Sequence, residues 1–292
     1  MRLIRLGAPG QERPAVLLDG NRAVDVSADV DDFGPSFFAA DGLDRLRGTV
    51  AKRHQTVDVA GRRFGPPIAR PNKLIGIGLN YIDHVQETGA EMPQEPVVFM
   101  KATNCIIGPN DDVVLPPGAT KLDWEVELAI VVAATARYLS HETEASEAIA
   151  GYCIANDVSE RAFQLERGGQ WVKGKSAETF CPIGPWLLTR DEVGDLDTVE
   201  LRLSVNGQLM QQASTRTMIF SPAHLVWYVS QFMVLEPGDL ILSGTPSGVG
   251  LTRGRYLREG DLMELSITGL GMQRQRVAPP TRTPPNRSGG TK

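Results

Sequence analysis

The stretch "DWEVELAIVVAA" (residues 123–134) places three carboxylates in its first five positions and then becomes almost wholly apolar. Its Val, Ile and Leu residues are typical of a strand that enters a core. Because successive side chains of a strand point to opposite faces, Glu125 and Glu127 are predicted to project from the same face. Two like charges side by side on one face repel each other. The strand therefore predicts a group at this face that makes the two glutamates tolerable.

Two interpretations of the Glu125–Glu127 pair are open. The side chains could lie at a solvated strand end and bind nothing. Alternatively, they could bind a hard divalent cation, because carboxylate oxygens suit Mg²⁺, Mn²⁺ or Ca²⁺ rather than a soft metal. A third oxygen ligand could come from Asp157, which follows the apolar stretch "GYCIAN" (residues 151–156). The three carboxylates together predict a metal site, although Asp157 alone could equally be a turn residue.

The composition of the 292-residue chain is that of an ordinary globular protein, with 41% hydrophobic and 22% charged residues. A net charge of −5 without a long Lys/Arg block argues against a nucleic-acid partner. The three widely spaced cysteines form no CxxC pair and are typical of reduced thiols. Neither a signal-peptide pattern nor a long apolar run is found, so we expect a cytoplasmic protein with no membrane partner.

The chain is predicted to divide into three regions. Residues 1–70 mix short strand-like pieces with an Asp-rich middle and are expected to form a small N-terminal domain. The proline-rich stretch "FGPPIARPNK" then leads into residues 71–277, where apolar strands and turns follow densely. Residues 278–292 are rich in Pro, Gly and Arg, and we expect a disordered tail. Many strands with few helices indicate a mixed α+β, mostly β architecture.

Local signals predict several individual elements. "LIGIGL" (residues 74–79) reads as a buried strand that runs into a short helix, with Asn80 as its N-cap and Gly89 as its end. The stretch "VELRLSVNGQLMQQA" predicts a hairpin with a type I′ turn at its Asn-Gly pair. Ser221 is predicted to cap a helix that has Pro222 at its first position.

His84 and Glu87 form a second candidate site on the short helix. At i and i+3 they lie on one helix face, close enough for the carboxylate to orient and polarise the imidazole. The competing interpretation is a surface histidine with an incidental ion pair. Gly76 and Gly78 before the helix, and Gly89 after it, suggest a segment able to move as a lid.

Two loops could approach a ligand. "GGQWVKGKSAETF" pairs glycines with Lys173 and Lys175, which are candidate donors to an anion, although a solvated loop would look similar. "SGTPSGVG" (residues 243–250) follows a strand directly, and its glycines permit close backbone approach to a ligand, with the Thr245 hydroxyl as a donor. Each loop alone is a weak signal.

Six segments of the chain, taken in order, resemble the fumarylacetoacetate hydrolase family. They are "GIGLNYIDHVQETG", "PVVFMKATNCIIGPNDDVVLP", "DWEVELAIVV", "GYCIANDVSERAFQ", "KGKSAETFCPIGPW" and "LSGTPSGVG". The resemblance covers about residues 72–277 and is more specific for the family than for a substrate. One residue departs from the family pattern, because Glu178 stands where many relatives have Asp. If this carboxylate orients Lys175, its extra methylene is expected to shift the lysine or the pocket.

The resemblance implies a fold, a cofactor and a set of roles. The fold would be a fumarylacetoacetate hydrolase-like β-roll behind a small N-terminal β domain, usually assembled as a homodimer. The cofactor would be Mg²⁺ or Mn²⁺, with Ca²⁺ possible in crystals. The metal ligands would be Glu125, Glu127 and Asp157. The remaining site residues fall into two groups, a lid dyad (His84 and Glu87) that activates water, and groups that surround the substrate (Arg161, Gln164, Lys175 and Thr245).

The implied reaction is hydrolysis of a 2,4-dioxo acid. Water activated by His84, tuned by Glu87, attacks the C4 carbonyl, and the C3–C4 bond breaks to release a pyruvate enolate. The metal acts as a Lewis acid, and Lys175 balances negative charge near the carboxylate or the developing enolate. The chain looks most similar to the bacterial branch that acts on 2,4-didehydro-3-deoxy-L-rhamnonate or L-fuconate, giving pyruvate and lactate. The substrate would then be a small 2-oxo acid.

Other activities stay open on the same site. They are oxaloacetate decarboxylation, ureidoglycolate lyase activity and hydroxymuconate-type isomerisation. A hypothesis of a different class is a non-catalytic acid-binding relative. The presence of all five residues of the metal site and the lid dyad argues against that class.

Overall fold

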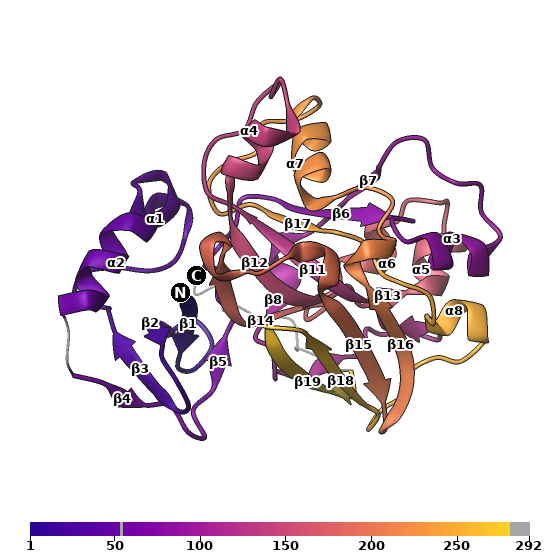
Figure 1. Cartoon of the computed structure of the whole chain (residues 1–292). Coiled ribbons are helices and arrows are strands. Elements are labelled where there is room, and N and C mark those ends of the chain that lie inside the picture. The colour runs from indigo at the N-terminus through magenta and orange to yellow at the C-terminus, as the bar shows by residue number, and fades with distance from the viewer. Residues whose placement is uncertain (53–54, 281–292) are drawn as a thin grey trace, which may run out of the picture.

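The computed structural model describes residues 1–52 and 55–280, and a large mixed sheet forms the centre of the fold (Figure 1). The strand order is β4-β3-β2-β1-β14-β12-β11-β17-β6-β7, with β5 beside β1 and β8 beside β14. The strands are β1 (Arg2–Leu6), β2 (Arg13–Leu17), β3 (Arg22–Asp25), β4 (Val57–Asp58), β5 (Phe64–Gly65), β6 (Leu74–Gly78), β7 (Val97–Lys101), β8 (Ile106–Ile107), β11 (Val126–Val132), β12 (Ile149–Asn156), β14 (Cys181–Thr189) and β17 (Leu240–Leu242).

A smaller sheet packs against the large one, with the order β16-β15-β18-β19-β9. Its strands are β9 (Val113–Val114), β15 (Glu200–Val205), β16 (Gln208–Ser214), β18 (Leu262–Ile267) and β19 (Gly271–Ala278). A short ribbon pairs β10 (Leu122–Asp123) with β13 (Ser159–Glu160). The strand-rich, mixed architecture predicted from the sequence is confirmed.

The helices are short and lie outside the sheets (Figure 1). They are α1 (Pro35–Ala39), α2 (Gly42–Lys52), α3 (Ile82–Thr88), α4 (Glu142–Glu147), α5 (Arg161–Leu165), α6 (Val172–Lys175), α7 (Pro222–Ser230) and α8 (Gly250–Arg253), with the 3₁₀ turns η1 (Thr103–Cys105), η2 (Arg190–Glu192), η3 (Leu196–Thr198) and η4 (Thr215–Thr217). Helices α1 and α2 occupy the Asp-rich stretch, where the sequence analysis predicted no helix. Within the described ranges, no helix has both the length and the apolar character needed to cross a membrane.

The N-terminal region shares its sheet with the rest of the chain. Strand β1 pairs antiparallel with β14, and the register sets Arg2 opposite Leu188 and Leu3 opposite Leu187. Backbone hydrogen bonds therefore join the region before residue 70 to the region after it. The domain boundary near residue 70 stays a prediction. Of the predicted disordered tail, Ala278 ends β19, and the residues from 281 onward lie outside the described part of the chain.

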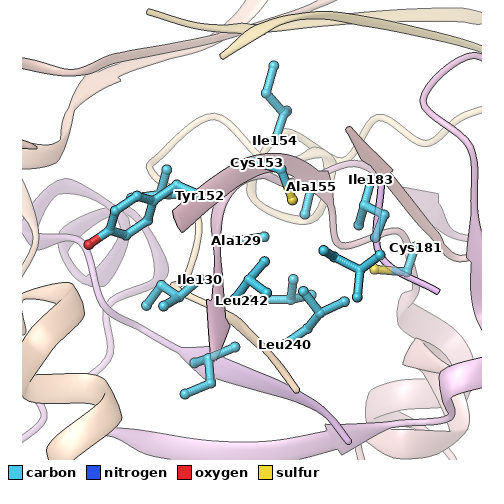
Figure 2. Close-up of a cluster of buried hydrophobic side chains, with 14 of the residues drawn as sticks. Ala129, Ile130, Tyr152, Cys153, Ile154, Ala155, Cys181, Ile183, Leu240 and Leu242 are labelled. Carbon is cyan, nitrogen blue, oxygen red and sulfur yellow. The ribbon is translucent and has the colours of Figure 1, made fainter. Parts of the chain in front are cut away.

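The core is densest where the central strands meet. Strands β11 and β12 are buried along their whole length, so the prediction of a buried strand at residues 123–134 is confirmed. Figure 2 shows Ala129 and Ile130 of β11 close to Leu240 and Leu242 of β17, with side chains of β12 and β14 beside them. A strand that is covered on both faces is typically a continuous run of apolar residues, and most of β11 is such a run. The three cysteines are free and buried.

Two local predictions are confirmed by the backbone. Strands β15 and β16 form the predicted hairpin, and Asn206 and Gly207 at its turn have φ values of 52° and 77°. Positive φ at both central residues is what a type I′ turn requires. Ser221 caps α7, because its hydroxyl accepts a hydrogen bond from the His224 amide at 3.1 Å, and Pro222 begins the helix.

The predicted N-cap role of Asn80 is wrong. Tyr81 is the residue before α3, and it makes no side-chain cap. The Asn80 side chain is buried and binds distant backbone instead: its Nδ2 donates to the carbonyls of Ser243 (2.8 Å) and Phe220 (3.1 Å), and its Oδ1 accepts from the Phe220 amide. These partners lie 140 or more residues away, so sequence spacing could not reveal them. Gly89 ends α3 in the left-handed conformation, as predicted.

Candidate active site

Helices α3, α5 and α6 gather near one end of the large sheet (Figure 1). Residues of these helices contribute to the lining of a cavity of about 160 Å³. Seven of the nine residues singled out from the sequence line it: His84, Glu125, Glu127, Arg161, Gln164, Lys175 and Thr245. The other two contact lining residues, because Glu87 binds His84 and Asp157 binds Lys175. Residues separated by up to 161 positions in the chain therefore surround one small space.

The pairing of β11 with β12 brings the three carboxylates together. Glu127 is the second residue of β11, Glu125 precedes that strand, and Asp157 follows β12. The register sets Val126 opposite Asn156, and the Asp157 amide donates to the Glu125 carbonyl at 2.9 Å. All three side chains are buried, and one carboxylate oxygen of each lies within 4.8 Å of the others. The two glutamates therefore do project to one side, and the solvated strand end is the wrong interpretation.

Two of the three carboxylates are paired with buried cations. The Lys175 Nζ donates to Glu125 Oε2 and to Asp157 Oδ2, each at 2.6 Å, and Arg161 Nη2 donates to Glu125 Oε1 at 2.5 Å. Burial by itself raises the pKa of Glu125, but the charges of Lys175 and Arg161 outweigh burial and hold that pKa well below its usual range. Glu125 is therefore an ionised carboxylate inside the fold.

Glu127 has the opposite electrostatic environment. It accepts a hydrogen bond from the Gly244 amide at 2.7 Å. Burial, and then the negative charges of Asp157 and Glu125, raise its pKa well above the ordinary value. Three buried hard oxygen donors, one of them held out of its preferred ionised state, fit a divalent cation such as Mg²⁺ or Mn²⁺. Glu125, Glu127 and Asp157 would hold that cation.

The contact between His84 and Glu87 forms as predicted from their i, i+3 spacing. His84 is only 7% exposed, and its Nδ1 lies 2.9 Å from Glu87 Oε1. The Gly248 amide and the Thr252 hydroxyl also donate to the Glu87 carboxylate. Burial raises the pKa of Glu87, but the hydrogen bonds from His84 and Gly248 outweigh burial and lower that pKa. With Nδ1 of His84 held by the Glu87 carboxylate, Nε2 is the ring nitrogen available as a base.

Helix α3 is tied to the loop of residues 243–250. Asp83 Oδ2 accepts from the Ser247 hydroxyl at 2.6 Å, and Glu87 accepts from the Gly248 amide. The loop thus binds α3 as well as the Glu127 carboxylate, through Gly244. Thr245 lines the cavity, but its hydroxyl donates to the Val126 carbonyl at 3.0 Å.

Arg161 and Gln164 line the cavity and are held in place by hydrogen bonds. Arg161 Nε donates to Asp123 Oδ2 at 2.8 Å, and its Nη1 donates to Gln164 Oε1 at 2.9 Å. Asp123, in turn, accepts from the amides of Gly250 (2.6 Å) and Leu251 (2.9 Å). The first carboxylate of "DWEVE" therefore anchors the arginine that pairs with Glu125. No role for Asp123 could be predicted from local spacing, because its partners lie 38 and 127 residues away.

Of the two lysines in the predicted anion loop, only Lys175 reaches the cavity. Lys173 is exposed, and its Nζ donates to the Arg167 carbonyl at 2.6 Å. A role of Glu178 in orienting Lys175 stays a prediction, whereas the buried Lys175 ammonium donates to Glu125 and Asp157. The two metal-site carboxylates therefore orient this lysine.

Gly76 and Gly78, which suggested a mobile segment before α3, belong to a paired strand. Both lie inside β6, where Gly76 pairs with Leu242 of β17 and with Phe99 of β7. A Cβ on Gly76 would lie 2.1 Å from the Phe99 ring, and one on Gly78 would lie 2.7 Å from the Trp171 ring. The glycines are therefore needed to seat two aromatic rings against the strand.

Lys101 is a charged residue of this site that the sequence analysis missed. It ends β7, and its buried Nζ donates to Asp157 Oδ1 and to the Phe180 carbonyl. Burial lowers the pKa of this lysine, but the charge of Asp157 outweighs burial and raises it. A lysine that closes the apolar run "PVVFMK" was the available signal, because an ammonium at the end of a buried strand needs a partner.

We expect Lys101→Met to lower the free energy of unfolding by about 3–5 kcal/mol, because it removes one partner of a buried ion pair and leaves the Asp157 charge less compensated. Urea unfolding in a chelator would measure this change. Lys173→Met is the matched control, since that lysine is exposed, and its effect should stay within about 0.5 kcal/mol. Equal stability of both variants would show that Lys101 does not support Asp157.

Comparisons with known proteins agree with this geometry. The family model described as fumarylacetoacetate (FAA) hydrolase C-terminal matches residues 73–278. A protein of Burkholderia multivorans, named in general terms as a hydrolase, is 48% identical over 278 residues, covering 94% of this chain and 98% of that protein. That match carries no named substrate.

Two solved structures are similar over nearly the whole chain. Maleylpyruvate hydrolase from Sphingobium sp. SYK-6, in complex with manganese(II) and pyruvate, has a TM-score of 0.80 at 27% identity, covering 96% of this chain and 100% of that one. 5-Carboxymethyl-2-hydroxymuconate delta-isomerase from Mycobacterium smegmatis has a TM-score of 0.77 at 34% identity, covering 97% and 100%. The family match over most of the sequence and the shared fold together lead to one conclusion: the chain belongs to the fumarylacetoacetate hydrolase family.

Proposed function

We propose that this protein is a divalent-cation-dependent hydrolase that cleaves the C3–C4 bond of 2,4-dioxo acids and releases pyruvate. The observation that carries the proposal is the meeting, in one small cavity, of the Glu125–Glu127–Asp157 cluster with a histidine oriented by a carboxylate. The first part suits a hard cation, and the second suits activation of water. The manganese and pyruvate bound to the similar maleylpyruvate hydrolase support the same assignment.

Different residues of the site would have different roles in this reaction. A bound Mg²⁺ or Mn²⁺ would supply Lewis acidity toward the carboxylate and 2-oxo group of the substrate. His84 would take a proton from water at Nε2, while Glu87 holds Nδ1 and stabilises the imidazolium that forms. Lys175 would balance the negative charge that develops as the C3–C4 bond breaks. The apolar side of the cavity would limit access of bulk water.

The proposal names a class of substrates, the 2,4-dioxo acids. The 2,4-dioxo-3-deoxy sugar acids expected from the sequence, which yield pyruvate and lactate, are members of the class. The named structural neighbours act on other compounds, so neither they nor the family match favours a particular acyl group.

The direct test is pyruvate release from 2,4-dioxopentanoate, coupled to lactate dehydrogenase. We expect turnover that disappears after chelation and returns with added Mg²⁺ or Mn²⁺. His224→Ala is a suitable control, because His224 pairs with Glu142 at 2.9 Å outside the residues that line the cavity. Absence of pyruvate with every 2,4-dioxo acid tested, in the presence of either metal, would reject the hydrolase.

Isomerisation is a second candidate function, favoured by the same histidine. His84 is placed to move a proton on the substrate as well as on water, and a structural neighbour carries an isomerase name. An isomerase would change the ultraviolet spectrum of a 2-hydroxymuconate-type compound without releasing pyruvate. Parallel spectral and pyruvate measurements would separate the two reactions.

A further inference from the structure

The side chains that line the cavity fall into a charged set and an apolar set, here called its charged end and its apolar end. All the ionisable side chains that line it belong to the site described above: His84, Glu125, Glu127, Arg161 and Lys175. The apolar end is formed by Ile77, Leu79, Phe99, Leu165, Trp171 and Leu251. Hydrolysis of a 2,4-dioxo acid uses the charged end for the reacting atoms and the 1-carboxylate, so the apolar end is left for the acyl group.

Two aromatic rings build the apolar end as a fixed wall. Phe99 and Trp171 meet edge to face, with ring centroids 5.4 Å apart. Gly76 and Gly78 seat these rings, since a side chain at either position would collide with one of them. The Lys175 ammonium lies 5.1 Å from the centroid of the Phe99 ring, so the charged and apolar side chains meet at this ring.

Among the described residues that line the cavity, no lysine or arginine is left unpaired for a second carboxylate. Arg161 and Lys175 are bound to carboxylates of the protein. Two further cations follow α5 in the chain, and neither lines the cavity: the Arg167 guanidinium stacks at 4.2 Å on Phe163, and Lys173 donates to the Arg167 carbonyl. A carboxylate buried at this end would therefore lose its hydration without gaining an ion pair.

We infer, on the basis of the proposed function, that the substrate is a 2,4-dioxo acid with an uncharged acyl end, a short alkyl or hydroxyalkyl group rather than a second carboxylate. The cavity of about 160 Å³ is smaller than the roughly 300 Å³ at which pockets for drug-sized ligands begin. A small monoacid fits these limits of size and charge. The lactoyl end of the dioxo sugar acids belongs to the uncharged class, and the acyl end of a diacid does not.

The test compares two acids of equal chain length. Butanoylpyruvate (2,4-dioxoheptanoate) and succinylpyruvate (4,6-dioxoheptanedioate) differ only in a terminal methyl or carboxylate. With Mg²⁺ present, we expect kcat/KM to be about 10²-fold or more higher for butanoylpyruvate, because succinylpyruvate buries an unpaired charge. Equal values, or a preference for succinylpyruvate, would overturn the inference while leaving the hydrolase function intact.

A charge placed at the apolar end should reverse part of this preference. Leu165 lines the cavity and is 46% exposed, so Leu165→Arg can place a guanidinium there without burying it fully. We expect the preference for butanoylpyruvate to fall by about tenfold or more in this variant. Leu209→Arg is the matched control, because Leu209 has nearly the same exposure (47%) but lies on β16, away from the cavity lining. An equal fall in both variants would contradict a local effect.

Calorimetric binding of the same two acids to the His84→Ala variant, with Mg²⁺, separates the inference from the proposed reaction. If neither acid is cleaved by the unaltered protein but butanoylpyruvate binds about tenfold or more tightly than succinylpyruvate, the uncharged acyl end is supported and the hydrolase is rejected. If neither acid binds and neither is cleaved, both are rejected.

Discussion

In a chelator, Glu127→Gln should make the protein more stable, whereas Glu125→Gln should lower its free energy of unfolding by about 3–5 kcal/mol. These two glutamates project to the same side, but the charges around them have opposite signs. Glu125 pairs with Lys175 and Arg161, so an uncharged amide at 125 leaves two buried cations without their shared carboxylate. Glu127 faces Asp157 and Glu125, so an amide at 127 removes like-charge repulsion.

The pH dependence of the Glu127 effect has a definite sign. Burial and the two neighbouring carboxylates raise the pKa of Glu127 above its ordinary value of 4.5. The folded protein therefore keeps a proton on Glu127 that the unfolded chain releases once the pH exceeds the unfolded pKa. The free energy of unfolding falls as the pH rises above that value. Glutamine cannot ionise. The gain from Glu127→Gln should accordingly be small near pH 4 and grow as the pH rises toward neutrality.

Both substitutions should abolish metal binding and metal-dependent turnover, because each removes a carboxylate ligand from a three-carboxylate site. Urea unfolding at several pH values in a chelator measures the stability effects, and titration calorimetry with Mn²⁺ measures binding. Glu264→Gln is the surface control, since its pair with Arg274 is 3.6 Å long and partly exposed, and it should change stability by about 0.5 kcal/mol or less. Unchanged Mn²⁺ affinity in both site variants would remove the metal assignment.

His84→Ala should reduce hydrolysis of 2,4-dioxo acids by about 10²–10⁴-fold while the protein keeps its fold and its metal affinity. The loss follows from the Glu87 contact, which leaves Nε2 of His84 as the base for water. Decarboxylation of oxaloacetate needs no activated water, so the same substitution should affect that reaction less. The ratio of the two rates in each variant is therefore the informative measurement.

His224→Ala supplies the matched control for this prediction. His224 and Glu142 form a second histidine–glutamate pair with the same 2.9 Å distance, and neither residue lines the cavity. We expect the control to keep hydrolysis within about twofold of the unaltered protein, because it touches no reacting group. An equal loss of hydrolysis and decarboxylation in His84→Ala would assign His84 to substrate binding instead of water activation.

Local patterns were sufficient for many elements of this fold. The apolar run of residues 126–132 predicted a buried strand, and the period of two placed Glu125 and Glu127 on the same side. The i, i+3 spacing likewise predicted the contact between His84 and Glu87. These inferences succeed because the geometry of a strand or a short helix depends on neighbours within a few residues.

Local patterns did not predict contacts between residues far apart in the sequence. Asn80 looked like a helix cap, but it binds backbone groups around residues 220 and 243. Gly76 and Gly78 suggested a segment able to move as a lid, but the structure shows that they make room for Phe99 and Trp171. Each interpretation was locally reasonable, but the contacts that these residues make come from segments distant in the sequence.

The sequence by itself determined the strand-rich class, the family and the side of β11 to which both glutamates project, because these depend on residue order and short spacing. Only the tertiary structure decided that Glu125 lies against two cations while Glu127 lies against two carboxylates. Lys175 reaches Glu125 from 50 residues away, and Lys101 reaches Asp157 from 56. Electrostatic energies between buried groups depend on distance in space, and the pairing of β11 with β12 and the docking of α5 and α6 set those distances.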